Sequence, residues 1–248
     1  MNEKRIKLFA SLAHSKFRKA HRLFLVEGIH AVMGLLESEW PMETIIMTDS
    51  FDQTGFPKRA KQISPEIAGR KVIDRIATTE TPQEIIAVAR IPDTDLKDAL
   101  SRDRIVIADG VKDPGNMGTI IRTAEALGFE SVITTAGAVD IFNPKVVRAT
   151  QGSMFFMHIA QRLGASDLLK RLKGEHTLYA LTSDGDIDLT GVRIDDKAAL
   201  ITGSEIGGIS NELLSAADFK VRIPIKGRSE SLNSAIAAGI AMYFLGRR

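Results

Sequence analysis

From residue 104 onward, short apolar runs alternate with segments of helical periodicity, and this alternation constrains the fold more than any other feature of the sequence. Arg104–Ala108 is an apolar, β-branched run, and Met117–Leu127 is a helical segment closed by Gly128, a frequent residue just after a helix. Strands and helices that alternate in this way form a mainly parallel sheet covered by helices on both faces, so we expect an α/β fold. Further strands are expected at Ser131–Thr134, Phe155–Ile159, Leu178–Leu181, Leu200–Thr202 and Val221–Ile223, and further helices at Pro144–Thr150 and Asn233–Leu245.

The first 92 residues are expected to form a separate, smaller α/β unit. Its predicted helices are Lys4–Leu12 and Ala31–Leu36, and its predicted strands are Leu23–Val26, Thr44–Thr48, Lys71–Ile73 and Ile85–Ala89. The stretch 91–95 is the predicted linker, because it is largely polar and Pro92 biases the preceding residue towards an extended backbone. We therefore expect one domain at residues 1–92 and a second at residues 96–248.

Composition excludes several classes of protein. The chain has no cysteine, which rules out a disulfide scaffold, a thiol nucleophile and a Cys-ligated metal or cluster. The five histidines show no ligand-like spacing, so no metal site is expected. The longest apolar run, Ala235–Leu245, is about half of what a bilayer span needs. No signal peptide is predicted, because His14 and Lys16 interrupt the only early apolar stretch, and we expect a cytoplasmic protein.

Positive charge is concentrated at the N-terminus. Residues 1–22 hold seven Lys and Arg side chains against Glu3 alone, a net charge of +6, so the rest of the chain carries −4 of the overall +2. A basic segment on a near-neutral body indicates a polyanionic partner, most simply a nucleic acid. A solvated basic helix face would explain the same pattern.

Three loops rich in glycine and polar residues follow predicted strands, at residues 109–124, 202–209 and 223–235. Open parallel sheets bind their ligands beyond the carboxyl ends of the strands, which is where these loops would lie. None of the loops has a G-x-G-x-x-G pattern or a P-loop, which argues against a nucleotide-dependent oxidoreductase on a doubly wound sheet. Taken singly, each loop is also compatible with ordinary helix caps and turns.

The three loops carry Asn116-x-Gly118-x-x-x-Arg122-Thr123, then Gly203-x-Glu205-x-Gly207, then Ile223-Pro224-Ile225 followed by Ser231-Leu232-Asn233-Ser234-Ala235. In this order they resemble the motifs of the SpoU/TrmH family of RNA ribose 2′-O-methyltransferases, within the SPOUT superfamily. The segments 24–28 and 79–83 resemble the substrate-recruiting domain that often precedes that enzyme domain. Thr150-Gln151 departs from the Ser-Ala that is common there, a difference relevant to substrate choice.

The resemblance implies a parallel-sheet SPOUT domain with a C-terminal trefoil knot, preceded by a small α/β RNA substrate-binding domain. It also implies S-adenosylmethionine as the methyl donor, bound largely by backbone groups where glycines allow a close approach, and a homodimer in which the last helix packs at the interface. The cofactor-binding residues it implies are Thr182, Gly203, Gly207, Ile223, Ile225, Ser231 and Leu232.

The implied reaction is attack of a ribose 2′-hydroxyl on the methyl group of a sulfonium, for which the protein supplies positioning and help with the hydroxyl proton. The resemblance makes Arg122 the central catalytic residue. A guanidinium is effectively never deprotonated in proteins, so a cationic Arg122 that stabilises the developing alkoxide is physically safer than Arg122 as a base. Asn116, Glu205, Ser231 and Asn233 would orient Arg122 and the ribose by hydrogen bonds.

The implied partner is RNA, and the recruiting domain favours ribosomal over transfer RNA. Phosphate contacts are expected from basic side chains, and binding should weaken steeply with added salt. These residues are Arg5, Lys16, Arg18, Lys19, Arg22, Arg148 and Arg228. The alternatives are a transfer-RNA 2′-O-methyltransferase, a base methyltransferase of the same superfamily, and a non-catalytic RNA-binding or ribosome-assembly factor on the same scaffold.

Overall fold

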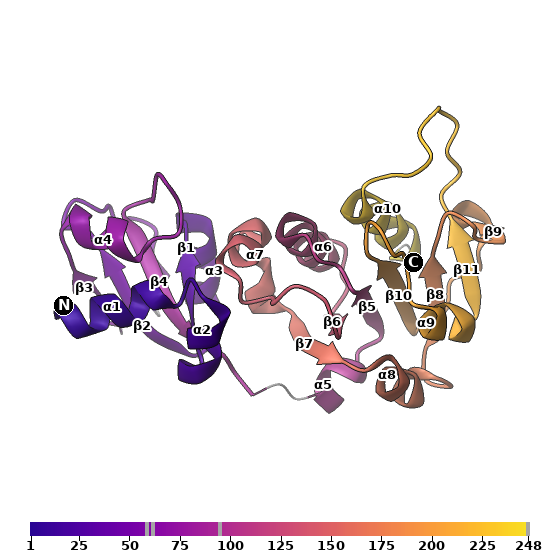
Figure 1. Cartoon of the computed structure of the whole chain (residues 1–248), viewed down its shortest axis with the longest axis horizontal. Helices are drawn as coiled ribbons and strands as arrows, with labels where there is room; N and C mark the ends of the chain where they lie inside the picture. Colours follow the sequence, from indigo (N-terminus) through magenta and orange to yellow (C-terminus); the bar gives the residue numbers. More distant parts are fainter. Residues whose placement is uncertain (58–59, 61–62, 94–95, 247–248) are drawn as a thin grey trace. The chain divides into compact units, whose positions relative to one another are not determined.

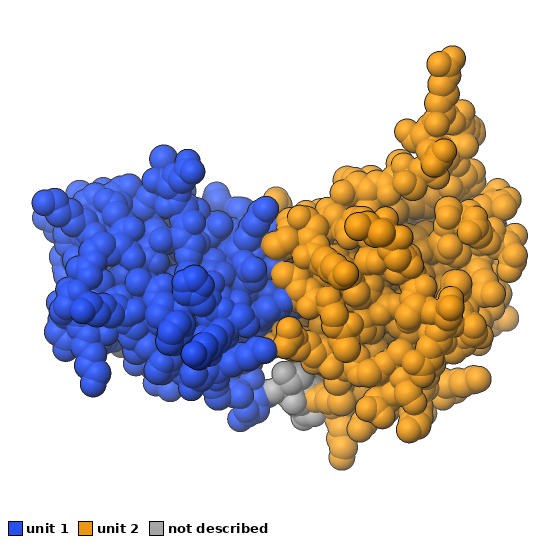
Figure 2. All heavy atoms as spheres, in the orientation of Figure 1, with its two compact units in different colours: residues 1–93, 140–156 blue, residues 94–139, 157–248 orange. Residues whose placement is uncertain are grey.

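The computed structural model describes residues 1–57, 60, 63–93 and 96–246. The chain divides into two compact units, coloured separately in Figure 2. Unit 1 contains residues 1–93 together with 140–156, and unit 2 contains residues 94–139 and 157–248. Residues 140–156 thus pack with the N-terminal part of the chain. A single domain boundary at the linker does not account for this arrangement. Of the predicted linker, Thr94 and Asp95 lie outside the described residues.

Unit 1 is built on a four-stranded mixed sheet in the order β1-β4-β2-β3, in which β1 and β2 run antiparallel to β4 and β3 runs parallel to β2. One of its hydrophobic cores lies between this sheet and helices α1 and α4. The strands are β1 (Leu23–Glu27), β2 (Met42–Met47), β3 (Glu66–Ile67) and β4 (Ile85–Arg90). The helices are α1 (Glu3–Ser11), α2 (Ser15–His21), α3 (Ile29–Glu37), α4 (Arg70–Ile76), α7 (Pro144–Thr150) and the 3₁₀ turn η2 (Ser153–Phe156).

Aromatic packing ties residues 140–156 to the first strand of unit 1. The ring of Phe24 on β1 lies 4.8 Å from that of Phe142, and the ring of Trp40 lies 5.4 Å from that of Phe155. Gly152 and Gly34 are in direct backbone contact, because a Cβ added to Gly34 would lie 2.9 Å from the Cα of Gly152. Such close packing explains why α7 belongs to this unit.

Two predictions in this region need correction. The strand predicted at Lys71–Ile73 is wrong, because these residues lie in α4, where Ile73 and Ile76 are buried one helical turn apart. An apolar run of three residues does not distinguish a strand from a helix by itself. The strand predicted at Phe155–Ile159 begins later, since η2 occupies residues 153–156 and the strand starts at His158.

Unit 2 confirms the expected α/β fold, with a seven-stranded parallel sheet in the order β7-β6-β5-β10-β8-β11-β9 (Figure 1). The central strands β5 and β10 are buried along their whole length, as continuous apolar runs require. The strands are β5 (Arg104–Asp109), β6 (Ser131–Thr135), β7 (His158–Leu163), β8 (Thr177–Leu181), β9 (Ile187–Asp188), β10 (Ala198–Gly203) and β11 (Phe219–Arg222). The helices are α5 (Leu96–Leu100), α6 (Pro114–Ala126), α8 (Ala165–Leu172), η3 (Leu189–Gly191), α9 (Asn211–Ala216) and α10 (Ser234–Leu245).

The strand order reverses between β5 and β10. The chain adds β6 and β7 on one side of β5, whereas β10 pairs with the other side. The loops that leave the carboxyl ends of these two neighbouring strands therefore lie next to each other, and such a switch point is where open α/β sheets bind ligands.

Helix α10 closes the unit by packing on α6 and β10. Its N-terminus is capped by Asn233, whose Oδ1 accepts from the amides of Ala235 and Ile236 at 3.0 and 3.2 Å. At its other end the Arg104 guanidinium donates to the carbonyl of Leu245. The segment between β11 and α10 projects from the body of the unit before it turns into the helix (Figure 1).

Candidate functional site

The site is centred on Glu205, which lies in the loop after β10 and forms hydrogen bonds with the first turns of α6 and α10. Its Oε1 accepts from Asn116 Nδ2 at 2.5 Å and from Ser234 Oγ at 2.9 Å. Asn116 Oδ1 in turn accepts from Asn233 Nδ2 at 3.0 Å. Residues from all three sequence motifs thus meet in a single network, although Asn116 and Asn233 are separated by 117 positions.

The two helix caps place these side chains. Asp113 caps α6, its Oδ1 accepting from the Asn116 amide at 2.8 Å, and Pro114 occupies the first turn. Asn233 caps α10 with its oxygen and therefore has its side-chain nitrogen available for Asn116. The same short segments therefore cap α6 and α10 and supply the side chains of the hydrogen-bond network. The start of each helix fixes the position of its network residues.

A cavity of about 520 Å³ opens beside this network. Glu205 and Asn233 line it, together with apolar side chains and hydroxyl groups from the ends of β8, β10 and β11. Among the residues expected to bind a cofactor, those that line it are Thr182, Gly203, Ile223, Ile225, Ser231 and Leu232. Gly207 is not among the lining residues, whereas its neighbour Gly208 is.

The glycines of the second motif shape the loop itself. A Cβ on Gly203 would lie 2.1 Å from the carbonyl carbon of Gly208, so no side chain fits there. Ser204 and Gly208 exchange two backbone hydrogen bonds of 3.1 and 3.0 Å, which close the turn that carries Glu205. A Cβ on Gly207 would lie 3.2 Å from Ser204 Oγ. The turn itself therefore requires glycine at position 203, in addition to the close cofactor approach that the resemblance implies.

Hydrogen bonding sets the protonation of Glu205. Partial burial raises the pKa of this carboxyl, and the charge of Asp113 adds to that effect. Hydrogen bonds from Asn116, from the Glu205 backbone and from Ser234 outweigh both, so the pKa lies below its ordinary value of 4.5. The carboxylate is therefore ionised at neutral pH and accepts hydrogen bonds from its neighbours.

Asp109 is a supporting residue that sequence reasoning missed. It is buried at the end of β5, where its Oδ1 accepts from Thr135 Oγ1 at 2.6 Å and its Oδ2 accepts from the Ser210 amide at 2.7 Å. It therefore ties together the loops that follow β5, β6 and β10. The available signal was an acidic residue at the end of a buried apolar run, directly before Gly110.

Arg122 lies on α6 with an exposed side chain, and it does not line the cavity. Within the described part of the chain it makes no hydrogen bond and no ion pair. Its guanidinium therefore keeps all its donors for a ligand. Among the described residues, the Glu205 carboxylate does not form an ion pair with Arg122.

The basic residues predicted to contact RNA differ in how much charge they present to solvent. Lys16 and Lys19 are exposed on α2, and Arg228 is exposed in the projecting segment before α10. Arg5 pairs with Glu66 at 2.5 Å, and Arg22 pairs with Asp93 at 2.7 Å.

Arg18 and Arg148 are engaged within unit 1. Arg18 is only 2% exposed, pairs with Asp140 at 2.6 Å and donates to the carbonyls of Leu12 and Ala13 at 2.9 Å. Because it is buried, Arg18 is not available to contact RNA. It instead holds Asp140 through the ion pair. Arg148 pairs with the buried Glu27 at 3.1 Å and remains partly exposed.

Among the residues that the structure describes, no group of His, Asp and Glu side chains is arranged to hold a metal ion. The same residues include no helix with the length and apolar character of a membrane span.

Comparison with known proteins matches both parts of the chain to families. Residues 103–243 match the SpoU rRNA Methylase family, and residues 3–87 match the MRM3-like substrate binding domain. The chain is 32% identical over 243 residues to the 23S rRNA (guanosine(2553)-2′-O)-methyltransferase RlmP of Bacillus subtilis, covering 97% of this chain and 95% of that protein.

Solved structures show the same architecture over nearly the whole chain. The SpoU methyltransferase AviRb from Streptomyces viridochromogenes, in complex with the cofactor AdoMet, is 27% identical with a TM-score of 0.87, covering 99% of this chain and 97% of that one. An AdoMet-bound rRNA methyltransferase from Sinorhizobium meliloti is 29% identical with a TM-score of 0.86, covering 98% and 94%.

Proposed function

Because the chain belongs to the SpoU rRNA methylase family, we propose that it methylates a ribose 2′-hydroxyl of ribosomal RNA with S-adenosylmethionine as the methyl donor. As a member of this family, the chain is an S-adenosylmethionine-dependent RNA 2′-O-methyltransferase. That its substrate is ribosomal RNA is our proposal. The observation that carries it is the network of Asn116, Glu205 and Asn233 at the wall of the cavity. A cytoplasmic location is consistent with such a substrate.

The cavity fits S-adenosylmethionine in size and chemistry. Its volume of about 520 Å³ is in the range of cofactor pockets. Ile223, Ile225 and Leu232 offer apolar surface for an adenine ring, and the Thr182 and Ser231 hydroxyls offer polar partners. When bound, the cofactor supplies an electrophilic methyl group on a sulfonium. Gly203 contributes by keeping the turn beside the cavity in place.

Arg122 is proposed to remain cationic and to stabilise the charge that develops on the attacking ribose oxygen, together with an adjacent phosphate. Its lack of a partner among the described residues supports this role, since its donors are available to RNA. Glu205, held ionised by its hydrogen bonds, orients Asn116. Asn233 and Ser231 line the same cavity. Together with Asn116 and Glu205, they are proposed to orient Arg122 and the ribose.

Residues 1–92 are proposed as the RNA substrate-binding domain and residues 96–248 as the methyltransferase domain. Support comes from the match of residues 3–87 to the MRM3-like substrate binding domain. We propose that RNA phosphates are contacted by the exposed or partly exposed basic residues, which supply affinity rather than sequence choice. These residues are Arg5, Lys16, Lys19, Arg22, Arg148 and Arg228.

A threaded C-terminal tail and a homodimer complete the proposal. The last strand, β11, lies beyond β8, and α10 returns to pack on β10 and α6, which brings the end of the chain back to the site as the proposed trefoil knot would. Ile236 and Tyr243 lie two turns apart on α10 and are 54% and 52% exposed. An apolar helix face of this kind suits burial against a second copy of the chain.

The proposed function is tested with Arg122→Ala. Calorimetry should give the same S-adenosylmethionine affinity as the wild type, because Arg122 does not line the cavity. Methyl transfer to ribosomal RNA transcribed in vitro should fall by about 10²–10³-fold. Arg171→Ala, an exposed arginine on α8, is the matched control and should leave both unchanged.

Two outcomes would contradict the proposal. Near-normal methylation by an Arg122→Ala protein that binds the cofactor would remove Arg122 from the mechanism. A wild-type protein that binds RNA but no S-adenosylmethionine would be a non-catalytic RNA-binding factor.

A further inference from the structure

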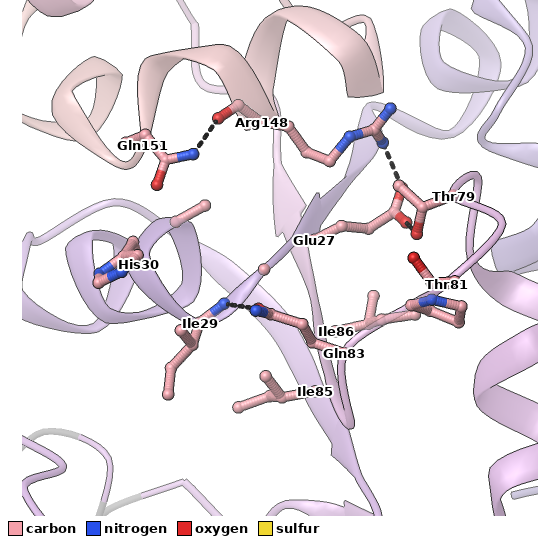
Figure 3. A pocket seen from close by; sticks show the side chains of 13 residues that line it. Glu27, Ile29, His30, Thr79, Thr81, Gln83, Ile85, Ile86, Arg148 and Gln151 are labelled. Atoms are coloured by element: carbon pink, nitrogen blue, oxygen red, sulfur yellow. Dashed lines mark hydrogen bonds and ion pairs between the residues drawn. The ribbon is translucent and has the colours of Figure 1, made fainter.

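Unit 1 contains a cavity of its own, of about 250 Å³, which shares no residue with the Glu205 network or with the cavity beside it. Three segments build it (Figure 3): the junction of β1 and α3, the loop before β4, and α7. Ile85 and Ile86 give it an apolar floor, and both are buried. Its polar wall includes His30, Thr79, Thr81, Gln83, Arg148 and Gln151.

Two glutamine side chains in this wall have fixed orientations. Gln83 Oε1 accepts from the amide of Ile29 at 2.6 Å, and Gln151 Nε2 donates to the carbonyl of Arg148 at 3.0 Å (Figure 3). A backbone N–H only donates and a carbonyl only accepts, so neither amide can be reversed without losing its bond. Gln83 is thereby left with a donating NH₂ group, and Gln151 with an accepting oxygen.

The charge in the cavity is balanced. Glu27 is 4% exposed, and its Oε1 accepts from Thr78 Oγ1 at 2.5 Å and from Arg148 at 3.1 Å. Arg148 also donates to Thr78 Oγ1 at 2.6 Å. The cation is therefore paired with a buried carboxylate, which makes the site a poor one for a phosphate, since phosphate sites present excess positive charge.

A neutral, planar ligand with both donors and acceptors along its edge fits these features. The apolar floor can take its face, and the amides of Gln83 and Gln151 can pair with its edge. The volume lies below the range for drug-sized ligands, so a single ring system is the right scale. An RNA-binding protein meets such a group as an unstacked base, because sequence-specific RNA recognition targets bases in loops and bulges.

We propose that this cavity of unit 1 binds one unstacked nucleobase of the substrate RNA, and that Gln83 and Gln151 select it by hydrogen bonds. The proposal rests on the proposed function, which makes RNA the substrate, and adds a second point of recognition outside the methyl-transfer site.

Gln83→Glu is the informative variant. The carboxylate still accepts from the Ile29 amide at the N-terminus of α3, so the fold and the helix cap are kept. It replaces the donating NH₂ group by a second acceptor. Gln53→Glu adds the same charge at an exposed position outside the cavity and is the matched control for general repulsion of phosphates. Thermal unfolding should show that both variants are folded.

Binding is measured by fluorescence anisotropy at one salt concentration. The probes are four RNA hairpins that differ only in one unpaired loop nucleotide, a fully paired RNA duplex of equal length, and the four free nucleoside monophosphates. The wild type should prefer one hairpin over the duplex and over the other hairpins. Gln83→Glu should lose about tenfold or more for that hairpin, or shift its preference to another base. Gln53→Glu should keep the wild-type preference.

Equal affinity of the wild type for all four hairpins would overturn the proposal, as would equal losses in Gln83→Glu and Gln53→Glu. A free monophosphate that binds as tightly as the hairpin would make this a mononucleotide site and would overturn it too. Calorimetry with S-adenosylmethionine and methylation of ribosomal RNA by the wild type are measured in parallel. Their success alongside a failed base preference would reject the cavity proposal alone, whereas their failure would reject the proposed function.

Discussion

At the scale of single residues, Gly203 decides whether the loop after β10 can close. The carbonyl carbon of Gly208 occupies the space that a Cβ would need, at 2.1 Å. We predict that Gly203→Ala lowers the free energy of unfolding by about 1–3 kcal/mol, because the turn must shift, and that it weakens S-adenosylmethionine binding. Denaturant unfolding and calorimetry measure the two effects.

Gly191→Ala is the control for this prediction, since a Cβ there meets no atom within 4 Å. It should leave both quantities nearly unchanged. Wild-type cofactor affinity in Gly203→Ala would show that the turn is not needed to form the cavity.

Glu205 gives the site a defined pH dependence. Its pKa is lowered in the folded protein, so its stabilising contribution is fully present above pH 4.5, its ordinary value, and is lost as the pH falls through the lower folded-state pKa. The difference in unfolding free energy between the wild type and Glu205→Gln should therefore be constant between about pH 6 and 8. A difference that shrinks near neutral pH would mean a raised pKa instead.

Sequence reasoning at this scale identified the residues of the network but not all their surroundings. Asn116, Glu205 and Asn233 were expected to act together, and they are hydrogen-bonded. The charge pattern of residues 1–22 predicts Arg18 at the surface, because such a pattern does not reveal burial against Asp140, 122 positions away. Asp109 was missed for the same reason, since its partners lie in other strands' loops.

At the scale of elements, the Asn233 side chain serves both the N-terminus of α10 and the hydrogen-bond network at Glu205. Asn233 caps the helix through Oδ1 and contacts Asn116 through Nδ2. We predict that Asn233→Ala lowers the free energy of unfolding by about 1 kcal/mol and also impairs methyl transfer. Asn233→Asp keeps a capping oxygen and should retain stability while losing the bond to Asn116 and much of the activity. Full activity in Asn233→Asp would separate the cap from the site.

Elements formed by strong local patterns were the ones that the sequence predicted well. The runs that became β5, β6 and β8 are apolar and bounded by turn residues, and Pro144–Thr150 was recognised by its cap and its proline. The sequence predicts a strand where the structure has α4, because the apolar run there is too short to show a period. Sheet order and the exchange of residues 140–156 depend on long-range packing, which no local pattern contains.

At the scale of the whole molecule, the proposed homodimer makes the exposed face of α10 a buried surface. We predict that the double variant Ile236→Asp, Tyr243→Asp is a monomer by light scattering, because buried unpaired charges oppose association. Ile67→Asp changes an equally exposed residue on β3 and should leave the assembly unchanged. A double variant with the mass of the wild-type assembly would show that subunits meet elsewhere.

The central claim is that the cavity beside Glu205 serves methyl transfer to a ribose hydroxyl. The direct measurement is to incubate the protein with ribosomal RNA transcribed in vitro and methyl-labelled S-adenosylmethionine, then to digest the RNA to nucleosides for mass spectrometry. The account predicts that the label is recovered in one 2′-O-methylated nucleoside. Label on a nucleobase, or RNA that acquires no label, would contradict it.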